Sequence, residues 1–534
     1  MSKLFDQLVA VRGLDKTFLH PKYEECIDAF LMPDMRKAVD RIKLAIQRQE
    51  KCLIYGDYDV DGVTASTALF DTLKMVGLMD VEIMLPNRFT DGYGMSNKVV
   101  QKAISDRVNL VFTVDCGSRN HEIIEKLNDH QIDTIVTDHH ECGDTLPEAV
   151  AVVNPKRKDI DITGSLRELA GVGVVFKLAQ ALVKAGLLPA GQEKWLLDLV
   201  FIGTICDNML LTGENRRLCH YGAVVTEKTR RPGLRELLRN AGVTKLTSDA
   251  IGYQIGPRLN AAGRLDTAEK ALNVLMASQR VSAAQLASEL EELNLKRKSL
   301  QKHALKEIAE QGIGGNPVII AKGEWHEGVL GIIAGRLTEQ YHRPAFVLAE
   351  IDGNLKGSGR SFGDFNLAEA LDICRKYIIT GGGHAAACGV KLEAENYEKF
   401  CNAINSYYQS LSLENQERYL EVHEDLCVQD FDDLSLEFFD EMKLLEPYGM
   451  GNQTPVFRLP NVRVVDASKM GNEGQHLRLQ LWDQNGHGLK VMKFNAPEEY
   501  LRLSGGETVD AWITLEENIF RGIRSLEGRI VKLA

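Results

Sequence analysis

KCLIYGDYDVDG, residues 51–62, is the stretch that decides the fold of this 534-residue chain. An apolar run ends at a glycine, and Asp57, Asp59 and Asp61 alternate behind it up to a second glycine. In an extended segment this alternation places three carboxylates on one side, where they repel one another unless cations neutralise them. An ordinary acidic turn or a calcium loop are the alternatives. A calcium EF-hand would need flanking helices and a glutamate at its twelfth position, whereas an apolar strand leads in here.

Further short apolar runs follow at residues 81–85, 110–114, 134–137 and 149–153. Helical patterns, such as those over 64–76 and 121–130, separate several of them. Short buried strands that alternate with helices indicate a parallel sheet in an α/β lobe. Functional residues of such sheets gather at the carboxyl ends of the strands.

Two of these strand ends carry polar residues: Asp115 follows the run 110–114, and Asp138, His139 and His140 follow the run 134–137. A single aspartate in this place is commonly a helix cap, and a single histidine is commonly a core residue. The combination is harder to explain that way. Asp207, after the apolar run 196–201, is a further candidate of the same kind.

Carboxylate together with imidazole suits Mn²⁺ or Mg²⁺, and the lack of cysteine in this set argues against structural zinc. The ten cysteines form no CxxC pair. Two such cations about 3.5–4 Å apart generate hydroxide and neutralise a phosphoryl transition state. The pattern therefore predicts a metal-dependent phosphoryl hydrolase.

The remainder of the chain divides by pattern. One long polar helix is predicted over 281–312, a second α/β pattern over 317–349, and a small β-barrel beyond Pro455. The predicted domains are a catalytic domain 1–225, a helical connector 226–314, a substrate-binding domain 315–410, an acidic connector 411–450 and a barrel 451–534.

The formal net charge of −12 counts at first against a nucleic-acid enzyme. Residues 411–450, however, carry 12 acidic and 2 basic residues, so −10 of that charge lies in the acidic connector. We expect a solvated acidic face there; a docking surface for a basic partner is the alternative. No apolar run approaches the ~20 residues of a membrane span, and the first residues lack a secretory apolar core. We therefore expect a cytoplasmic protein without a membrane partner.

The order of DYDVDG, DCG, DHH and GTICDNM resembles the four motifs of the DHH phosphoesterase superfamily. Longer stretches, IGPRLNAAGRLDTAEKAL, WHEGVLGIIAGRL, GGGHAAACG and LEPYGMGNQTPVF, resemble the RecJ family, bacterial exonucleases that degrade single-stranded DNA from the 5′ end. The resemblance covers nearly the whole chain. It implies an α/β fold with a DHH-type parallel-sheet lobe, a long connecting helix, a DHH-associated second α/β lobe and a C-terminal OB-fold barrel.

The resemblance implies two divalent cations, Mn²⁺ or Mg²⁺. Their ligands would be Asp59, Asp61, Asp115, His139 and Asp207. Asp115 is the expected bridging ligand, and Asp57 belongs to the same cluster. Asp138 would orient the histidines, and His140 would contact the scissile phosphate or assist the leaving oxygen.

For substrate, the resemblance implies phosphate contacts from Arg88, Arg258 and Arg264. Ser358, Arg360 and His384 would form a pocket for the 5′ end, and the residues after Gly381–Gly383 are expected to start a helix that favours an anion. In the barrel, Trp482, Phe494, Trp512 and Phe520 could stack on bases.

The sequence thus predicts a metal-dependent exonuclease that converts single-stranded DNA, 5′→3′, into 5′-mononucleotides, in DNA repair and recombination. It is expected to be a monomer, with a single-strand-binding protein and a helicase as candidate partners. One alternative is a DHH-type phosphodiesterase for short oligonucleotides or cyclic dinucleotides, although such enzymes resemble only the first two lobes. The other is a non-catalytic DNA-binding relative, which could have lost its ligands.

Overall fold

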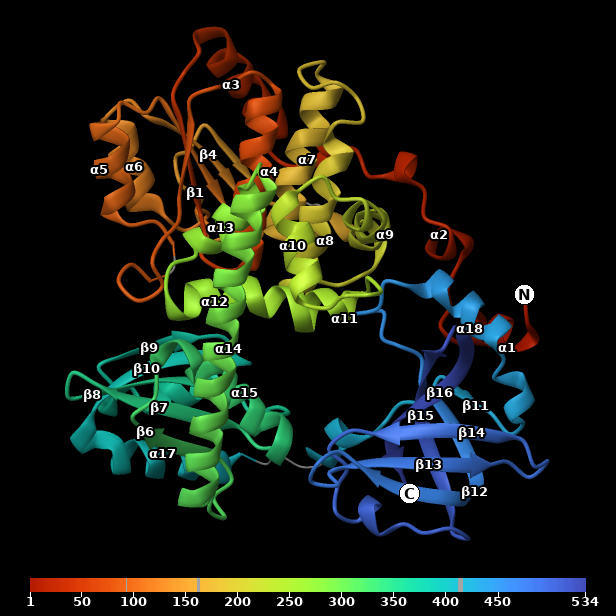
Figure 1. The fold of residues 1–534 in the computed structure, drawn as a ribbon. Helices are drawn as coiled ribbons and strands as arrows, with labels where there is room; N and C mark the ends of the chain where they lie inside the picture. Colours follow the sequence, from red (N-terminus) through yellow and green to blue (C-terminus); the bar gives the residue numbers. More distant parts are fainter. Residues whose placement is uncertain (93, 161–163, 412–415) are drawn as a thin grey trace. The chain divides into compact units, whose positions relative to one another are not determined.

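The computed structural model describes residues 1–92, 94–160, 164–411 and 416–534 (Figure 1). They form two compact units. The first unit comprises Met1–Gly256, Leu272–Ala283 and Val422–Ala534, and the second comprises Pro257–Ala271 and Ala284–Glu421. The two ends of the chain therefore belong to one unit. The bounds of the five predicted domains remain a prediction.

A parallel sheet forms the centre of the N-terminal part of the first unit. Its strands are β1 (Cys52–Gly56), β2 (Val81–Met84), β3 (Leu110–Val114), β4 (Asp133–Thr137) and β5 (Ala151–Val153). They follow the order β2-β1-β3-β4-β5 and all pair in parallel. β1 and β3 are buried along their whole length, as strands of a sheet covered on both faces must be. All five strands predicted from the apolar runs are confirmed.

Helices cover both faces of this sheet: α3 (Met35–Arg48), α4 (Val60–Met75), α5 (Asn97–Ser105), α6 (His121–Asp129) and α7 (Gly171–Lys184). α8 (Leu197–Cys206) packs on α4 and α7, and α9 (Gly213–Glu227) packs on α8. α5 and α6 lie side by side, and α4 packs against α7 and α8 (Figure 1). The helix predicted over 64–76 begins earlier, at Val60, so it starts among the aspartates that precede it.

A run of helices leads from this lobe to the second sheet. It comprises α10 (Pro232–Asn240), α11 (Ser248–Ala250), α12 (Gly256–Leu265), α13 (Glu269–Met276) and α14 (Arg280–Gln311). The long helix predicted over 281–312 is confirmed as α14, which contains no glycine or proline. Among the described residues, no helix is both long and apolar enough to cross a membrane.

The second unit is built on a mixed sheet with the order β6-β7-β8-β10-β9. Its strands are β6 (Ile319–Gly323), β7 (Ala345–Ile351), β8 (Asn354–Arg360), β9 (Thr380–Gly383) and β10 (Ala387–Glu393), and its helices are α15 (Leu330–Tyr341), α16 (Leu367–Ile373) and α17 (Tyr397–Ser410). The helix start predicted after Gly381–Gly383 is wrong. These glycines form the edge strand β9, which pairs with β10, and the His384 amide donates to the Ala387 carbonyl within the turn.

The C-terminal strands form the predicted OB-type barrel. They are β11 (Leu426–Cys427), β12 (Phe457–Met470), β13 (His476–Trp482), β14 (Gly488–Lys493), β15 (Thr508–Phe520) and β16 (Ile523–Leu533). β12 also pairs with β15, which closes the barrel. Alternate residues Leu477, Leu479 and Leu481 of β13 are buried, as expected for a strand with one face on the core.

The core of the barrel also contains the N-terminal helix α1 (Lys3–Val11). Leu4, Phe5 and Leu8 of α1 are buried in one apolar cluster with Phe438 of α18 (Leu436–Met442) and with the barrel strands. The Ser2 amide donates to the Glu441 carboxylate at 2.8 Å. The sequence patterns did not indicate this pairing of the first helix with the last domain.

Candidate metal centre

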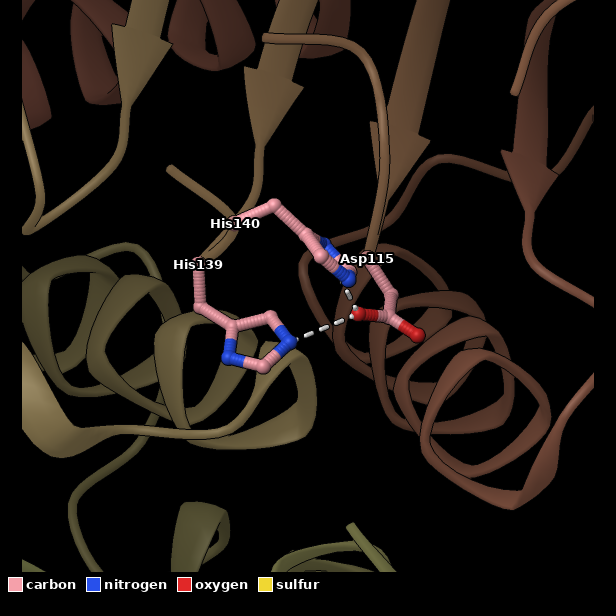
Figure 2. A group of neighbouring side chains, drawn as sticks. All are labelled: Asp115, His139 and His140. Atoms are coloured by element: carbon pink, nitrogen blue, oxygen red, sulfur yellow. Dashed lines mark ion pairs between the residues drawn. The ribbon is translucent and has the colours of Figure 1, made fainter. Parts of the chain in front are cut away.

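Carboxylates and imidazoles converge at the carboxyl edge of the parallel sheet. Asp57 follows β1, Asp115 follows β3, and the run Asp138–His140 follows β4. Because the ends of parallel strands meet at one edge, side chains distant in sequence become neighbours. Figure 2 shows Asp115, His139 and His140 pointing toward one another.

The three aspartates of the first motif are not all in an extended segment. Asp59 is the N-cap of α4 and accepts a hydrogen bond from the Gly62 amide at 3.0 Å, as capping aspartates do. Asp61 therefore lies in the first helical turn, and the expectation that alternation aligns all three side chains is wrong for it. At Gly62, a Cβ atom would approach the Asp57 carbonyl oxygen to 2.5 Å, so only glycine allows the helix to start this close to the strand.

Asp61 is held by the beginning of α7. Its carboxylate accepts hydrogen bonds from the Gly171 amide at 2.6 Å and the Val172 amide at 2.9 Å. Free amides at a helix N-terminus favour an anion. This contact orients a carboxylate that is 1% exposed.

Asp115 lies at the centre of the group. Its Oδ1 is 3.0 Å from Nε2 of His139 and 3.7 Å from Nδ1 of His140 (Figure 2). Its backbone has the left-handed φ of 60°, which aspartate tolerates better than most residues. This turn, with the Asp115 amide donating to the Thr137 carbonyl at 3.0 Å, places the side chain over the sheet edge.

His139 connects three carboxylates. Besides Asp115, its Nε2 lies 3.5 Å from Oδ2 of Asp207 and 3.8 Å from Oδ2 of Asp61. Asp207 does not follow a strand, as the apolar run before it suggested. That run is the buried helix α8, and Asp207 is its C-cap.

Asp138 accepts hydrogen bonds rather than joining this group. Its carboxylate receives the amides of Ser118, His139 and His140, and lies 2.9 Å from Nδ1 of His140. Asp138 thus contacts the ring of His140, while it contacts His139 only through the backbone amide.

Burial and mutual repulsion raise the pKa values of the crowded carboxylates. Burial, and then the charge of Asp59, raise the pKa of Asp57 to about 8 and that of Asp207 to about 7. The pKa values of Asp61 and Asp115 are also raised, by burial and then by a neighbouring carboxylate. Such clusters favour cation binding.

The histidine pair has opposite shifts. Burial, and then the charge of His140, lower the pKa of His139 to about 3, so this imidazole is neutral and able to bind a metal. For His140, burial acts to lower the pKa, but the hydrogen bond and charge of Asp138 raise it above its usual value. Burial acts to raise the pKa of Asp138, yet its hydrogen bonds from His140 and from backbone amides hold it well below the usual range.

The donor set fits divalent cations. Three overlapping groups have ligand atoms within 4.8 Å of one another: Asp57, Asp59 and Asp115; Asp61, His139 and Asp207; and Asp115, His139 and His140. The ring nitrogens of His139 are buried, and Nε2 faces the carboxylates of Asp115, Asp207 and Asp61. Oxygen and imidazole donors without thiolate suit Mn²⁺ and Mg²⁺.

Of the predicted phosphate ligands, Arg88 belongs to the same unit as this centre. Its guanidinium lies 4.5 Å from the centroid of the Tyr58 ring. Its positive charge also acts to lower the pKa of Asp57, so it lies beside the carboxylates.

The other predicted substrate residues lie in the second unit. Arg258 pairs with Glu291, with Nη2 at 3.2 Å from Oε1, and Nη1 of Arg264 is 3.4 Å from the Gly328 carbonyl oxygen. Ser358 and Arg360 lie on β8 and converge at Gly331 of α15: a Cβ there would lie 3.6 Å from the Ser358 Oγ and 2.9 Å from the Arg360 Nη2.

His384 lies in the turn between β9 and β10. Ala387, the first residue of β10, pairs with Arg360 of β8. The second unit therefore brings Ser358, Arg360 and the His384 turn to one region. Their approach to the metal centre remains a prediction.

Sequence reasoning missed a group that follows β5. Nδ2 of Asn154 donates to the His140 carbonyl at 2.9 Å and to Oγ of Ser118 at 2.8 Å. Lys156, whose Nζ lies 3.8 Å from the Glu141 carboxylate, follows the same strand, and its charge contributes to lowering the pKa values of His139 and Asp207. The rule that functional residues follow parallel strands, applied to the fifth strand as well, would have found Asn154 and Lys156.

The four barrel aromatics differ in exposure. Trp482, Phe494 and Phe520 are 44%, 47% and 65% exposed. Nε1 of Trp512 donates to the Glu424 carboxylate at 2.8 Å. The first three have exposed ring surface for stacking.

Three family models match the chain: the DHH family N-terminal domain over residues 51–204, the DHHA1 domain over 315–410 and the RecJ OB domain over 427–532. Among curated proteins, the single-stranded-DNA-specific exonuclease RecJ of Bacillus subtilis is 36% identical over 93% of this chain, which spans 64% of that relative's length. The protein of the same name from Haemophilus influenzae is 33% identical over 98% of this chain and 95% of the relative.

A solved structure has the same fold. The crystal structure of RecJ in complex with Mn²⁺ from Thermus thermophilus superposes with a TM-score of 0.84 and 29% identity, covering 99% of this chain and 75% of that one. A second structure of RecJ from the same organism, in complex with Mg²⁺, gives a TM-score of 0.79 and 27% identity, covering 100% and 74%.

Proposed function

Because the chain belongs to the RecJ family of single-stranded-DNA-specific exonucleases, we propose that it hydrolyses single-stranded DNA 5′→3′ to 5′-mononucleotides. The observation that carries this function is the convergence of Asp115, His139 and Asp207 with the aspartates of the first motif at one sheet edge. DNA repair and recombination are the proposed biological context.

The chain would hold two divalent cations, Mn²⁺ or Mg²⁺. The proposed ligands are Asp59, Asp61, Asp115, His139 and Asp207, with Asp115 shared. When bound, such cations activate water and stabilise the negative charge that develops on the phosphoryl group. The two related structures from Thermus thermophilus are complexes with these same ions. The hydrogen bonds from Gly171 and Val172 hold the Asp61 carboxylate in place for this role.

His140 is the proposed proton donor to the leaving oxygen. Asp138 fixes the ring through Nδ1, and its charge keeps the imidazole protonated to a higher pH than usual. The side chain of His140 is 43% exposed, whereas that of His139 is 6% exposed, so His140 is the histidine that substrate can reach. Asp57, with its raised pKa, adds a carboxylate that holds a proton until cations bind.

Phosphate groups of the strand would be bound by arginines. Arg88 lies over the ring of Tyr58, the residue that follows Asp57, and would bind a phosphate near the metal centre. Arg258 and Arg264 would bind phosphates further along the strand, and Ser358, Arg360 and His384 would receive the 5′ end. Guanidinium groups suit this role because they bind phosphate oxygens in pairs.

The two rival functions fit less well. A phosphodiesterase for short oligonucleotides or cyclic dinucleotides does not account for the match to the RecJ OB domain over 427–532. A non-catalytic relative would have no need of a complete ligand set. We further propose that the protein acts in the cytoplasm as a monomer, with a single-strand-binding protein and a helicase as partners.

The test follows label release from a single strand labelled at the 5′ or the 3′ end, with Mn²⁺, Mg²⁺ or chelator. Early release of the 5′ label in Mn²⁺ or Mg²⁺, and none in chelator, is expected. Asp115→Ala should abolish release. Asp430→Ala, which changes a partly exposed group of two aspartates and a histidine in the barrel region, should not. Early release of the 3′ label would contradict the polarity, and full activity of Asp115→Ala would contradict the metal centre.

A further inference from the structure

The first unit contains a concave pocket of about 380 Å³ that the proposed nuclease reaction does not use. It lies at the C-terminal end of α4, where Phe70 and Lys74 contribute to its wall. Asp61 is on the first turn of the same helix. About 20 Å of helix separates Asp61 from Lys74 at 1.5 Å per residue, so the pocket is remote from the metal centre.

The floor of the pocket is apolar. Phe70 of α4, Trp195 of the short helix Glu193–Leu196, and Leu275 and Met276 at the end of α13 line it. Methionine is flexible and polarisable, so a site that contains it adapts to apolar side chains of different shape. A floor of this kind suits an inserted apolar side chain better than a sugar or a phosphate.

The pocket is lined by three cationic side chains, Lys74, Arg230 and Arg231, and by two aspartates. Arg231 lies 2.7 Å from Oδ2 of Asp71 and 3.3 Å from Oδ2 of Asp198, so it offsets part of their negative charge. Arg230 is exposed, and its guanidinium lies 3.5 Å from the centroid of the Trp195 ring.

The sequence around these arginines is basic in a chain that is acidic as a whole. Residues 228–239, KTRRPGLRELLR, carry five basic residues and one acidic residue, whereas the chain has a net charge of −12. Arg230, Arg231 and Pro232 of this segment line the pocket at the start of α10. Its charge complements an anionic partner.

We propose that this pocket is a docking site for an acidic peptide segment of another protein, anchored by one bulky apolar side chain. The apolar side chain would fill the floor between Trp195 and Met276, and flanking carboxylates would meet Arg230 and Lys74. A partly buried aromatic surface with an arginine beside it has the composition of a binding hot spot. A DNA strand is a weaker candidate, because phosphates gain nothing from the apolar floor. The proposal does not rest on the nuclease function.

The test measures fluorescence anisotropy of a labelled short peptide, a Leu-Phe pair flanked by glutamates and aspartates, with the full chain in chelator. Two comparison peptides replace the Leu-Phe pair by alanines or the acidic residues by lysines. The acidic apolar peptide should bind, and both comparison peptides should bind at least about tenfold more weakly. The affinity of the acidic apolar peptide should also fall as the salt concentration is raised. Equal binding of all three peptides, or of none, would overturn the proposal.

Arg230→Glu and Trp195→Ala should each weaken peptide binding by about tenfold or more. Arg36→Glu is the matched control, because Arg36 is also an exposed arginine stacked on a ring, 4.8 Å from the Phe30 centroid, and does not line the pocket. The Arg36→Glu variant should bind the peptide as tightly as the unaltered chain does. Arg230→Glu should retain nuclease activity on bare single strands, which shows that it folds. Unchanged peptide binding by Arg230→Glu, or an equal loss of oligonucleotide binding, would overturn the proposal.

Discussion

Two acidic regions of the molecule, the metal centre and the acidic connector, use the same side chains in opposite ways. In the metal centre, buried carboxylates lie beside other carboxylates, and the pKa of Asp207 rises to about 7. In the connector, each of several carboxylates meets a donor of this chain. Arg524, and then Lys443, lower the pKa of Asp440 to about 2. Acidic composition alone therefore does not tell the two regions apart. They differ in whether hydrogen-bond donors or other carboxylates lie beside each carboxylate.

The donors of the connector come from both ends of the chain. Asp425 accepts from Nε and Nη2 of Arg12 at 2.6 and 2.9 Å, and from the Val456 amide at 2.9 Å. These contacts join the connector to other parts of the same chain. A docking surface for a basic partner and a solvated acidic face both stay predictions for it. Its −10 charge says little about DNA binding elsewhere in the molecule.

Asp115→Asn should have the largest effect. It removes the carboxylate at the centre of the cluster, and the nuclease rate should fall by about 10³-fold or more, because a cation contributes several kcal/mol of transition-state stabilisation. The metal-free variant should unfold at the same temperature as the unaltered chain or higher, because one repelling charge is gone. Single-turnover rates and thermal unfolding in chelator check both. A large loss of stability would assign Asp115 a structural role instead.

His140→Ala should lower the rate by about 10²-fold, the usual range for a general acid. Because the pKa of His140 is raised, the unaltered chain should lose activity as the pH rises through that pKa, and the variant should lack this alkaline limb. His487→Ala is the control: His487 also pairs with aspartates, at 2.9 Å from Asp430, but lies in the barrel region. Rate profiles over pH, at saturating Mn²⁺, decide the point. An unaltered alkaline limb in His140→Ala would remove His140 from that role.

Cation binding should release protons. In the metal-free fold, Asp57 and Asp207 have pKa values of about 8 and 7, above the ordinary value of 3.8. Their contribution to stability is complete below pH ~4 and is lost progressively as the pH rises from there through the folded pKa values of about 7 and 8. The chelated protein should therefore lose stability over that range, and Mn²⁺ should raise the unfolding temperature more at about pH 8.5 than at about pH 6.

Calorimetry in buffers of different ionisation enthalpy should show release of about one to two protons per molecule at about pH 7. A stabilisation by Mn²⁺ that does not change with pH would show that these carboxylates are already ionised in the metal-free fold.

Changes in the connector should affect stability and leave chemistry intact. Asp425→Ala breaks a bidentate ion pair and leaves the Val456 amide without its acceptor, at a cost of about 1–3 kcal/mol in the free energy of unfolding. The nuclease rate per folded molecule should stay within about twofold. Chemical denaturation and rate assays on one preparation measure both. A large loss of rate at full stability would mean that the connector acts in catalysis.

The smallest effect is expected for Asp440→Asn. Its partners are exposed, and surface ion pairs contribute little. The unfolding temperature should change by no more than about 1 °C. A larger change would show that the contact between α18 and β16 is as important as the one made by Asp425.

The sheet and most of the metal centre could be predicted because strand ends in a parallel sheet share one edge. That rule needs only local sequence, and it correctly grouped Asp57, Asp115 and His139. It could not show that Asp61 sits on a helix held by α7, because that contact joins residues more than a hundred positions apart. It misassigned the apolar run before Asp207, since a short buried run looks the same in a helix and a strand.

The structure of the glycine run was predicted wrongly, and the packing of the first helix was not predicted, for related reasons. Gly381–Gly383 lack side chains that would favour a helix or a strand, so pairing with β10 decided their structure. The apolar face of α1 predicts that something covers it, without indicating which segment.

The packing of α1 into the barrel bears on how the protein is made. Ser2 and its partner Glu441 are 439 residues apart, so a ribosome adding roughly 5–20 residues per second needs about 20–90 s between them. During that time the apolar face of α1 has no native cover, and the barrel cannot complete its core until its last strands emerge. The newly made chain should therefore depend on a chaperone early, and a bulky fusion at the N-terminus should slow maturation of the most distant domain.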